Sequence, residues 1–191
     1  MAHIAIEGMD GVGKTTTCKL LAERLGYKFI EKNLRFLFDD NDSFDNYFRI
    51  RDKVNANPDR LFTSWFYGLG NIYLYTMFKD ENIITDRHFL SNYAWSGTDD
   101  NTEVYDLLVK KLGFPDLTVI LYADETAIFN RLRSRDEHDS DLDKVQKAKE
   151  KYKKMVFFCE KYKMPYMVVD TSNLTPDQTV ELIMKRIEGR A

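Results

Sequence analysis

Short apolar runs alternate along the chain with longer stretches of helical periodicity. The runs lie at residues 3–7, 27–31, 82–86, 117–122 and 165–170. The stretches predict helices at 14–25, 44–54, 58–78, 102–112, 124–134, 142–162 and 175–187, several with Ser, Thr or Asp near their starts as caps. Strands that alternate with helices are typical of a parallel sheet. The pattern therefore predicts an α/β fold, a three-layer sandwich in which a five-stranded parallel sheet is flanked by helices.

Length and composition narrow the class of protein. At 191 residues the chain fits one domain, residues 1–191, around a single core. Its 28 Lys and Arg residues against 31 Asp and Glu residues give a net charge of −3, which offers no footprint for a nucleic acid or an anionic membrane. No signal peptide fits ahead of residue 8, and no apolar run approaches the roughly 18 residues of a membrane span. We expect a cytoplasmic protein.

Cysteine and histidine usage indicates no metal site. Cys18 and Cys159 lie in no metal-ligand spacing, and we expect both to be buried, reduced thiols. His3, His88 and His138 do not cluster along the chain, so no site built from protein ligands alone is suggested.

The strongest motif follows the first predicted strand. Residues 8–15 match G-x-x-x-x-G-K-[ST] between a strand and a helix, which is the context of a phosphate-binding loop, or P-loop. Lys14 would reach the β- and γ-phosphates, the Thr15 hydroxyl would ligate Mg²⁺, and the positive end of helix 14–25 points at the same anion. The predicted nucleotide-binding residues are Gly8, Met9, Asp10, Gly11, Val12, Gly13, Lys14, Thr15 and Thr16.

A second signal is the acid and base that end the third predicted strand. Ligands of a doubly wound sheet bind beyond the carboxyl ends of its strands, so Asp86 and Arg87 would face the phosphates. Asp86 could hold Mg²⁺ or its waters, and Arg87 could clamp a second phosphate with two hydrogen bonds. The structural alternative is that Asp86 caps the next helix and Arg87 pairs with it on the surface. The nearby P-loop favours the functional interpretation.

These motifs together resemble the thymidylate kinases, within the P-loop nucleoside and nucleotide kinases. The resemblance rests on IEGMDGVGKTTT at 6–17 and DRHFLSNYA at 86–94, and it continues through RLRSR at 131–135 and VDT at 169–171. Residues 33–80 match poorly. The resemblance implies a P-loop NTPase fold with an arginine-bearing lid at approximately residues 131–143, ATP as phosphoryl donor with Mg²⁺, and a homodimer.

The resemblance also implies roles for single residues. Asp10 would contact the acceptor sugar, Asp86 would assist Mg²⁺ and the acceptor, and Arg87 would bind the acceptor's phosphate. Arg131, Arg133 and Arg135 match the arginine-rich lid that closes over the donor phosphates. Arg131 and Arg135 are four apart and share a helix face, so we expect Arg135 and then Arg131 to act on the transferred phosphoryl group. The alternative for each is a solvated arginine at a helix end.

The sequence departs from the family pattern in the loop and in the lid. Val12 stands where some relatives place an arginine, so the lid would supply the transition-state charge. The acidic segment 136–141 would repel phosphate, and we expect it to point outward.

The largest departure concerns the acceptor base. The family carries an aromatic and, four residues later, an arginine beside the base, whereas here Phe66 is followed by Gly70. We expect most aromatics of helix 58–78 to be buried in the core and at most two of Trp65, Phe66 and Tyr67 to meet a base. Candidates to replace the arginine are Arg49, Arg51 and Arg60. Specificity for thymine therefore has no support in this segment.

Glu31 keeps a second acceptor class open. It ends the second predicted strand, where deoxynucleoside kinases carry a glutamate that accepts the proton of a sugar 5′-hydroxyl. A nucleoside acceptor benefits from such a base, whereas a monophosphate oxygen is already ionised.

Three functions follow from these observations. The first is ATP-dependent transfer of a phosphoryl group to a nucleoside monophosphate, with dTMP or a related deoxynucleotide as acceptor. The second is a deoxynucleoside kinase with Glu31 as base. The third is a nucleotide-binding regulatory protein, although the chain has no Asn-Lys-x-Asp motif for guanine.

Overall fold

The apolar runs of the chain form one sheet. The computed structural model describes residues 1–40, 43–137 and 139–189. Within these residues five parallel strands pair in the order β2-β3-β1-β4-β5. They are β1 (His3–Gly8), β2 (Lys28–Glu31), β3 (Ile83–Asp86), β4 (Leu117–Tyr122) and β5 (Tyr166–Asp170). The predicted α/β fold with a five-stranded parallel sheet is confirmed.

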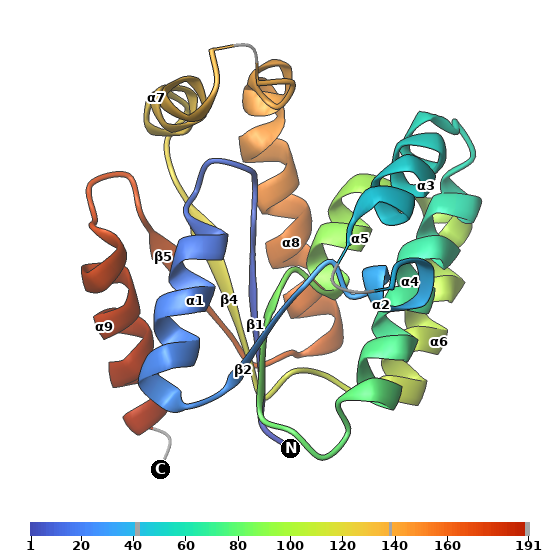
Figure 1. The fold of residues 1–191 in the computed structure, drawn as a ribbon, viewed down its shortest axis with the longest axis horizontal. Coiled ribbons are helices and arrows are strands. Elements are labelled where there is room, and N and C mark those ends of the chain that lie inside the picture. The colour runs from blue at the N-terminus through green and yellow to red at the C-terminus, as the bar shows by residue number, and fades with distance from the viewer. Residues whose placement is uncertain (41–42, 138, 190–191) are drawn as a thin grey trace.

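Helices cover both faces of the sheet (Figure 1). Consecutive residues of a strand point to opposite faces, and in β4 Val119 and Ile120 belong to different cores. Val119 packs with Leu21 and Val180 of two helices on one face, and Ile120 packs with Phe158 on the other. The first face carries α1 (Lys14–Leu25) and α9 (Pro176–Glu188), and the second carries α5 (Phe89–Ser96), α6 (Thr102–Leu112) and α8 (Ala148–Tyr162). The result is the predicted three-layer sandwich.

The strand order places one loop at the centre of the molecule. β1 lies between β3 and β4, so the connections out of β1 and β3 run to opposite sides of the sheet. In open parallel sheets such a reversal leaves a crevice beyond the carboxyl ends of the strands. The loop after β1 therefore lies where α/β proteins bind their ligands. Helix α7 (Glu125–Arg135) lies at the same edge (Figure 1).

Helices α4 (Arg60–Met77), α7 and α9 start at capping residues that the sequence contains. The Asp59 carboxylate accepts hydrogen bonds from the N–H groups of Leu61 and Phe62 at the start of α4. Asp124 caps α7 in the same way, and Thr175 forms a capping box with Gln178 at α9. Between β2 and α4 lie α2 (Arg35–Phe38) and α3 (Asp45–Ala56).

The predicted helices differ from the structure in three places. Neither α2 nor α5 was predicted, because α2 has only four residues and α5 has no side-chain cap within its own sequence. The predicted helix 142–162 begins as a 3-10 helix, η2 (Leu142–Lys147), and only then continues as α8. A further 3-10 turn, η1 (Asp99–Asn101), precedes α6. Both cysteines are buried and free, as predicted.

Helix α4 contradicts the expectation that its aromatics are buried in the core. It buries small or polar residues, among them Ser64, Gly68 and Asn71. A Cβ atom at Gly68 would lie 2.9 Å from the side chain of Leu108, so the small residues let α4 approach α6 closely. Phe62 and Trp65 are 47% and 41% exposed as a result. In the described ranges no helix is both long enough and apolar enough to span a bilayer.

Candidate active site

The P-loop requires glycine at positions where a side chain would collide or strain the backbone. Gly8 ends β1 with φ of 141°, and a Cβ atom there would lie 2.4 Å from the carbonyl oxygen of Leu121. At Gly11, with φ of 81°, a Cβ atom would lie 3.0 Å from Ile128. Such backbone conformations are open to glycine. The loop thus lies close against β4 and α7.

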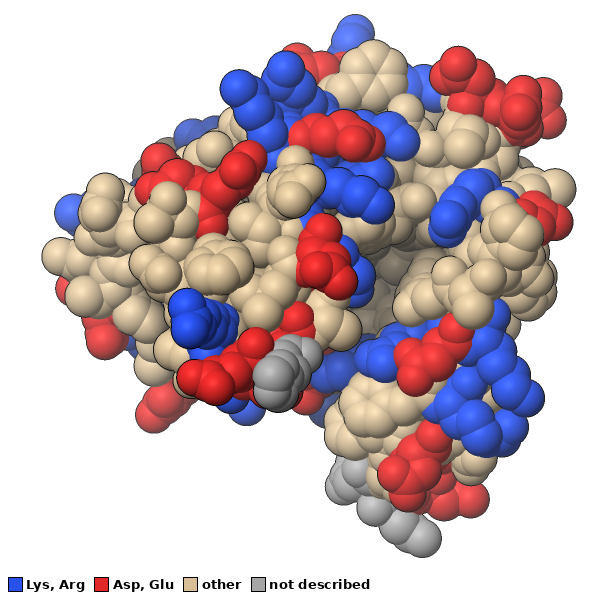
Figure 2. All heavy atoms as spheres, turned by 90° about the horizontal axis from the view of Figure 1, so that it is seen from above, with Lys and Arg blue, Asp and Glu red and all other residues tan. Residues whose placement is uncertain are grey.

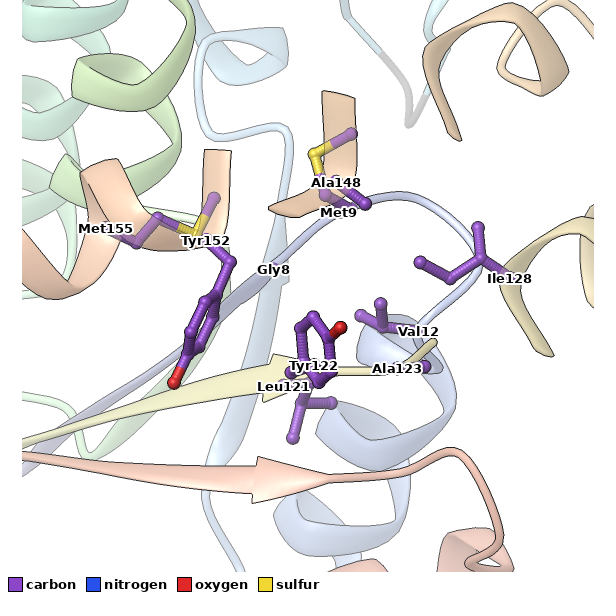
Figure 3. A pocket seen from close by; sticks show the side chains of 10 residues that line it. All are labelled: Gly8, Met9, Val12, Leu121, Tyr122, Ala123, Ile128, Ala148, Tyr152 and Met155. Atoms are coloured by element: carbon purple, nitrogen blue, oxygen red, sulfur yellow. The ribbon is translucent and has the colours of Figure 1, made fainter. Parts of the chain in front are cut away.

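A small apolar gap separates the P-loop from its support (Figure 3). Side chains of Met9 and Val12 face Ile128 of α7 and Ala148 of α8 around a volume of about 10 Å³. A cavity of this size barely admits one water molecule, and its lining is mostly apolar. We interpret it as packing beneath the loop and assign it no ligand.

Lys14 lies inside the loop. It is 6% exposed, and its Nζ donates to the carbonyl oxygen of Met9 at 2.7 Å and lies 3.5 Å from Asp10. Burial and the charge of Arg87 lower the pKa of Lys14, while Asp10 and Asp86 raise it. The ammonium group is therefore held at the start of α1, where the helix dipole also favours an anion.

Thr15 and Asp86 meet across the loop. The Thr15 hydroxyl donates to the Asp86 carboxylate at 2.6 Å. Hydroxyl and carboxylate oxygens are ligands that suit Mg²⁺, which also keeps waters and binds nucleotide phosphates. The two predicted magnesium ligands are thus side by side, and their chemistry fits the ion.

Arg87 lies between Asp10 and the end of β1. Its Nη2 donates to Asp10 at 2.6 Å, and its Nη1 donates to the carbonyl oxygen of Gly8 at 3.1 Å and to the Ser91 hydroxyl at 2.9 Å. Burial acts to raise the pKa of Asp10, but Arg87 and Lys14 hold it well below its ordinary value. The alternative in which Arg87 pairs with Asp86 and Asp86 caps a helix is wrong, because Asp10 and Thr15 are their partners.

Glu7 is a buried acid that no sequence motif identifies. Its side chain, in β1, accepts hydrogen bonds from the N–H groups of His88, Leu90 and Ser91 and from the Ser91 hydroxyl. Burial raises the pKa of Glu7, against the hydroxyl of Ser91 and the charge of Arg87. An acid in an otherwise apolar strand is the signal that points to this residue.

A cleft of about 370 Å³ opens beside the P-loop. Arg131 and Arg135 of α7 line it together with Thr171 and Leu174 of the loop after β5. The predicted shared face of Arg131 and Arg135 is confirmed, and Arg133 does not line the cleft. Figure 2 views this edge of the molecule and shows that Lys and Arg side chains gather there.

Arg131 bonds to two loops rather than to an acid. Its Nη2 donates to the carbonyl oxygen of Thr171 at 2.5 Å, and its Nη1 donates to the Thr171 hydroxyl at 3.2 Å and to the carbonyl oxygen of Gly11 at 3.4 Å. Arg131 therefore ties α7 to the P-loop and to the loop after β5.

Arg135 is paired with acids of the segment that follows α7. Its guanidinium contacts Asp139, and its Nη2 lies 3.6 Å from Asp141. Lys144 donates to Asp141 at 2.6 Å. The expectation that segment 136–141 points outward is wrong for these two acids, because Arg135 and Lys144 draw them inward. Residue 138 lies outside the described part of the chain.

The other side of the P-loop carries aromatic residues from three helices. Phe38 and Phe66 stack with ring centroids 6.0 Å apart and planes 7° apart. Tyr47 is 6% exposed, and the charged groups that face its phenol include Arg51 and Arg87. Burial and the neighbouring Tyr67 raise the pKa of Tyr47. Phe38 and Tyr47 lie in the segment that resembles the family least, so no motif identified them.

Glu31 lies at the same edge of the sheet. It is paired in register with Asp86 of β3, and Lys32 donates to its carboxylate at 2.7 Å. The structure therefore brings Glu31 close to Asp86. Thr16, the last of the predicted loop residues, lines the cleft beside the P-loop.

Comparison with known proteins agrees with this geometry. A family model described as "AAA domain" matches residues 4–153. A probable thymidylate kinase of Saccharolobus solfataricus is 27% identical, with 96% of this chain and 97% of the relative covered.

Solved structures of low sequence identity share the fold. Thymidylate kinase from Candida albicans superposes with a TM-score of 0.69 at 20% identity over 99% of this chain and 92% of its own. Deoxyadenosine kinase from M. mycoides, solved with bound dCTP, superposes with a TM-score of 0.62 at 22% identity, with 98% of this chain and 99% of that chain covered. The chain therefore belongs to the AAA domain family, and it is a P-loop kinase similar to the thymidylate kinases.

Proposed function

We propose that the chain transfers the γ-phosphoryl group of ATP to a nucleoside monophosphate, with dTMP or a related deoxynucleotide as the acceptor. The observation that carries this proposal is the position of Arg87, whose guanidinium lies between Asp10 and the carbonyl oxygen of Gly8, directly beside the P-loop. An acceptor phosphate is the anion that such a planar cation binds with two hydrogen bonds. A nucleoside brings no phosphate.

The donor side of the proposal uses the P-loop and the lid. Backbone N–H groups of the loop and Lys14 would hold the β- and γ-phosphates, and Thr15 and Asp86 would hold Mg²⁺. The ion, when bound, neutralises charge on the phosphates. Arg135 lies on the lid side of the cleft, and Arg131 lies nearer the loop after β5. We expect Arg135 to meet the transferred phosphoryl group, where a positioned arginine is worth about 10³-fold or more in rate.

The acceptor side provides surfaces for a base and a sugar. Asp10, which pairs with Arg87, would meet the acceptor sugar, and Phe66, which stacks on Phe38, would offer a ring face to a base. Of the candidates for the missing base-pocket arginine we favour Arg51, whose charge acts on the buried phenol of Tyr47.

One observation supports a nucleoside acceptor as the second candidate. Glu31 lies beside Asp86 in the sheet, at the edge where the phosphates would lie, and a carboxylate there could accept the proton of a 5′-hydroxyl. Lys32 pairs with Glu31, however, and no such base is needed for an ionised phosphate acceptor.

A labelling experiment separates these functions. The chain is incubated with Mg²⁺ and ATP labelled at the γ-phosphate, together with a panel of nucleosides and nucleoside monophosphates. We expect label on a monophosphate. Label on nucleosides alone would favour the deoxynucleoside kinase with Glu31 as base. No label on any acceptor would favour the regulatory alternative.

We also propose that the chain forms a homodimer through the exposed face of α4. This stripe consists of Leu61, Phe62, Trp65, Leu69 and Ile72, which are 39–49% exposed. Residues 61–78 contain no charged side chain, so a partner has no charge to complement there.

The area of the stripe fits a second copy. Large side chains have a surface on the order of 150–250 Å² each, so five of them at 39–49% exposure offer about 400 Å² per copy and about 800 Å² for a pair. A stable interface buries about 1,200–2,000 Å² in total, of which a polar rim supplies the rest. A straight helical stripe can pair with itself about a two-fold axis.

Sedimentation analysis tests the dimer. We expect the wild type to be a dimer at micromolar concentration and the double variant W65E/L69E to be a monomer with unchanged thermal unfolding, because both side chains are exposed. The control is Phe157→Glu, which places the same charge on another exposed aromatic, on α8. A monomeric wild type, or a stripe that binds vesicles instead, would contradict the proposal.

A further inference from the structure

Glu7 has more hydrogen-bond partners than a strand residue needs. Its side chain is 0% exposed, yet all four partners donate to it: three N–H groups at 2.8, 2.9 and 3.1 Å and the Ser91 hydroxyl at 2.5 Å. Burying a carboxylate costs several kcal/mol unless it is fully hydrogen-bonded, and an apolar residue would serve the strand without that cost. The residue therefore has a use beyond the folding of β1.

The donors belong to the segment that follows Arg87. They are the first turn of α5, which has no cap from its own side chains. Glu7 supplies that cap from β1, and a negative charge at a helix N-terminus is favourable. Arg87 itself has φ of 76°, a left-handed conformation that is strained for a residue with a side chain. The bonds from Glu7 hold the chain in this turn.

Ser91 links Glu7 to the guanidinium. A hydroxyl has one proton, and Ser91 gives it to Glu7, so its oxygen is left to accept from Nη1 of Arg87 at 2.9 Å. The other contacts of the guanidinium are the carbonyl oxygen of Gly8, adjacent to Glu7 in sequence, and Asp10. One buried carboxylate thus fixes both the backbone and the side chain of Arg87.

We infer that Glu7 is a positioning residue for phosphoryl transfer, which acts through Ser91 and the turn at Arg87 to hold the Arg87 guanidinium toward the acceptor phosphate. The inference rests on the proposed function, because that function gives Arg87 its role. Because its side chain is 0% exposed, Glu7 would act through these groups and not by direct contact with a substrate.

The kinetic test combines Glu7→Gln with Arg87→Ala. Glutamine keeps one oxygen that can accept from His88 and Leu90. At the other position it presents an amide NH₂, which cannot accept the hydrogen bonds of the Ser91 N–H and hydroxyl. We expect kcat/KM for the monophosphate to fall about 10²-fold in Glu7→Gln, as a misplaced contact group can cause. The KM for ATP stays the same. In the Arg87→Ala background Glu7→Gln changes kcat/KM by less than about twofold. Equal losses in both backgrounds would overturn the inference.

A second variant guards against loss of folding. Ser91→Ala leaves Glu7 and its N–H donors in place and removes only the hydroxyl link, so we expect the same selective fall in kcat/KM. Glu81→Gln, at an exposed acid that pairs with Lys28, is the control for loss of one negative charge. A Ser91→Ala variant with wild-type kcat/KM would contradict the hydroxyl link.

An NMR measurement separates this inference from the proposed function. The Nε–H resonance of Arg87, assigned with Arg87→Lys, reports the guanidinium without any substrate. We expect Glu7→Gln to move it and Glu81→Gln to leave it unchanged. If the wild type labels no acceptor, the proposed function fails while the resonance still tests Glu7. An unmoved resonance would overturn the Glu7 inference even in an active kinase.

Discussion

The hydroxyl of Thr15 donates a 2.6 Å hydrogen bond to the carboxylate of Asp86, which joins the P-loop to the end of the neighbouring strand β3. The two side chains come from positions 71 residues apart, and each provides an oxygen that Mg²⁺ can use. In the proposed reaction this contact would link the donor phosphates to the strand end that carries Arg87.

We expect Asp86→Asn to raise the Mg²⁺ concentration needed for half-maximal transfer. The amide keeps an oxygen beside Thr15 but loses the charge that attracts the cation, and loss of such a group typically costs about 10–100-fold in metal affinity or activity. Titration of the rate with Mg²⁺ at saturating ATP measures the effect. An unchanged Mg²⁺ dependence would exclude Asp86 from the ion's surroundings.

Lys14→Ala should abolish most phosphoryl transfer and leave the fold intact. The ammonium group bonds to Met9 and lies near Asp10, both within the loop, so its loss removes a cation from the phosphates rather than from a core. Removal of one group that stabilises transition-state charge costs about 10²–10³-fold in kcat. Turnover and thermal unfolding are measured together, and wild-type turnover in a folded variant would refute the assignment of the loop.

Arg87→Ala should weaken the monophosphate acceptor and leave ATP binding unchanged. A hydrogen bond to a charged group contributes about 1.5–3 kcal/mol, so we expect acceptor affinity to fall about 10- to 100-fold. Calorimetric titration with each nucleotide measures this. Arg24→Ala is the matched control, since Arg24 pairs with Asp177 on the exposed ends of α1 and α9. Unchanged acceptor affinity would leave Arg87 as a structural partner of Asp10.

We expect Asp139→Asn to strengthen ATP binding modestly. Arg135 is held by Asp139 and Asp141, and donor phosphates would compete with these acids for it. Exposed ion pairs contribute about 0.2–1 kcal/mol, so the KM for ATP should fall by at most about fivefold. Glu137→Gln removes another acid of the lid and is the control. Equal KM values in the two variants would show that Arg135 does not leave Asp139 for the phosphates.

The spacing of apolar residues and the P-loop motif were sufficient to predict the sheet and the P-loop. The motif at residues 8–15 is flanked by a strand before Gly8 and a helix after Gly13, and the spacing of apolar residues predicts both. The same is true of Asp86, whose position at a strand end places it beside Thr15. Local patterns of this kind need no knowledge of distant contacts.

The remaining features depend on contacts between distant segments. The start of α5 is capped by Glu7 of β1, 81 residues before His88, so no local signal marks that helix. The aromatics of α4 were predicted as core because a long apolar stripe normally faces inward, whereas here Gly68 and Ser64 make the close contacts. The inward acids Asp139 and Asp141 likewise reflect the position of Arg135, which charge patterning alone does not define.

The last prediction concerns His88, a buried imidazole in an aromatic cluster. Its ring lies 5.0 Å from that of His3 and 4.1 Å from that of Phe89, and neither ring nitrogen has a hydrogen-bond partner among the described residues. Burial lowers the pKa of His88 well below its ordinary value and that of His3 to about 3.

These lowered pKa values make the free energy of unfolding fall in mild acid. Below pH 6.5 the unfolded chain binds a proton at His3 and another at His88 that the folded chain does not bind, so protons favour unfolding. Each histidine then contributes a decrease of about 1.4 kcal/mol per pH unit. The variant His88→Phe keeps an aromatic ring and the backbone N–H bond to Glu7. Its free energy of unfolding should match that of the wild type at pH 7 and should lose one of the two histidine contributions to the decrease in acid. Urea unfolding at pH 7, 6 and 5 gives the free energy of unfolding against pH for the wild type and for the variant. The two proteins share every other titrating group. Parallel curves would show that His88 is protonated in the folded chain.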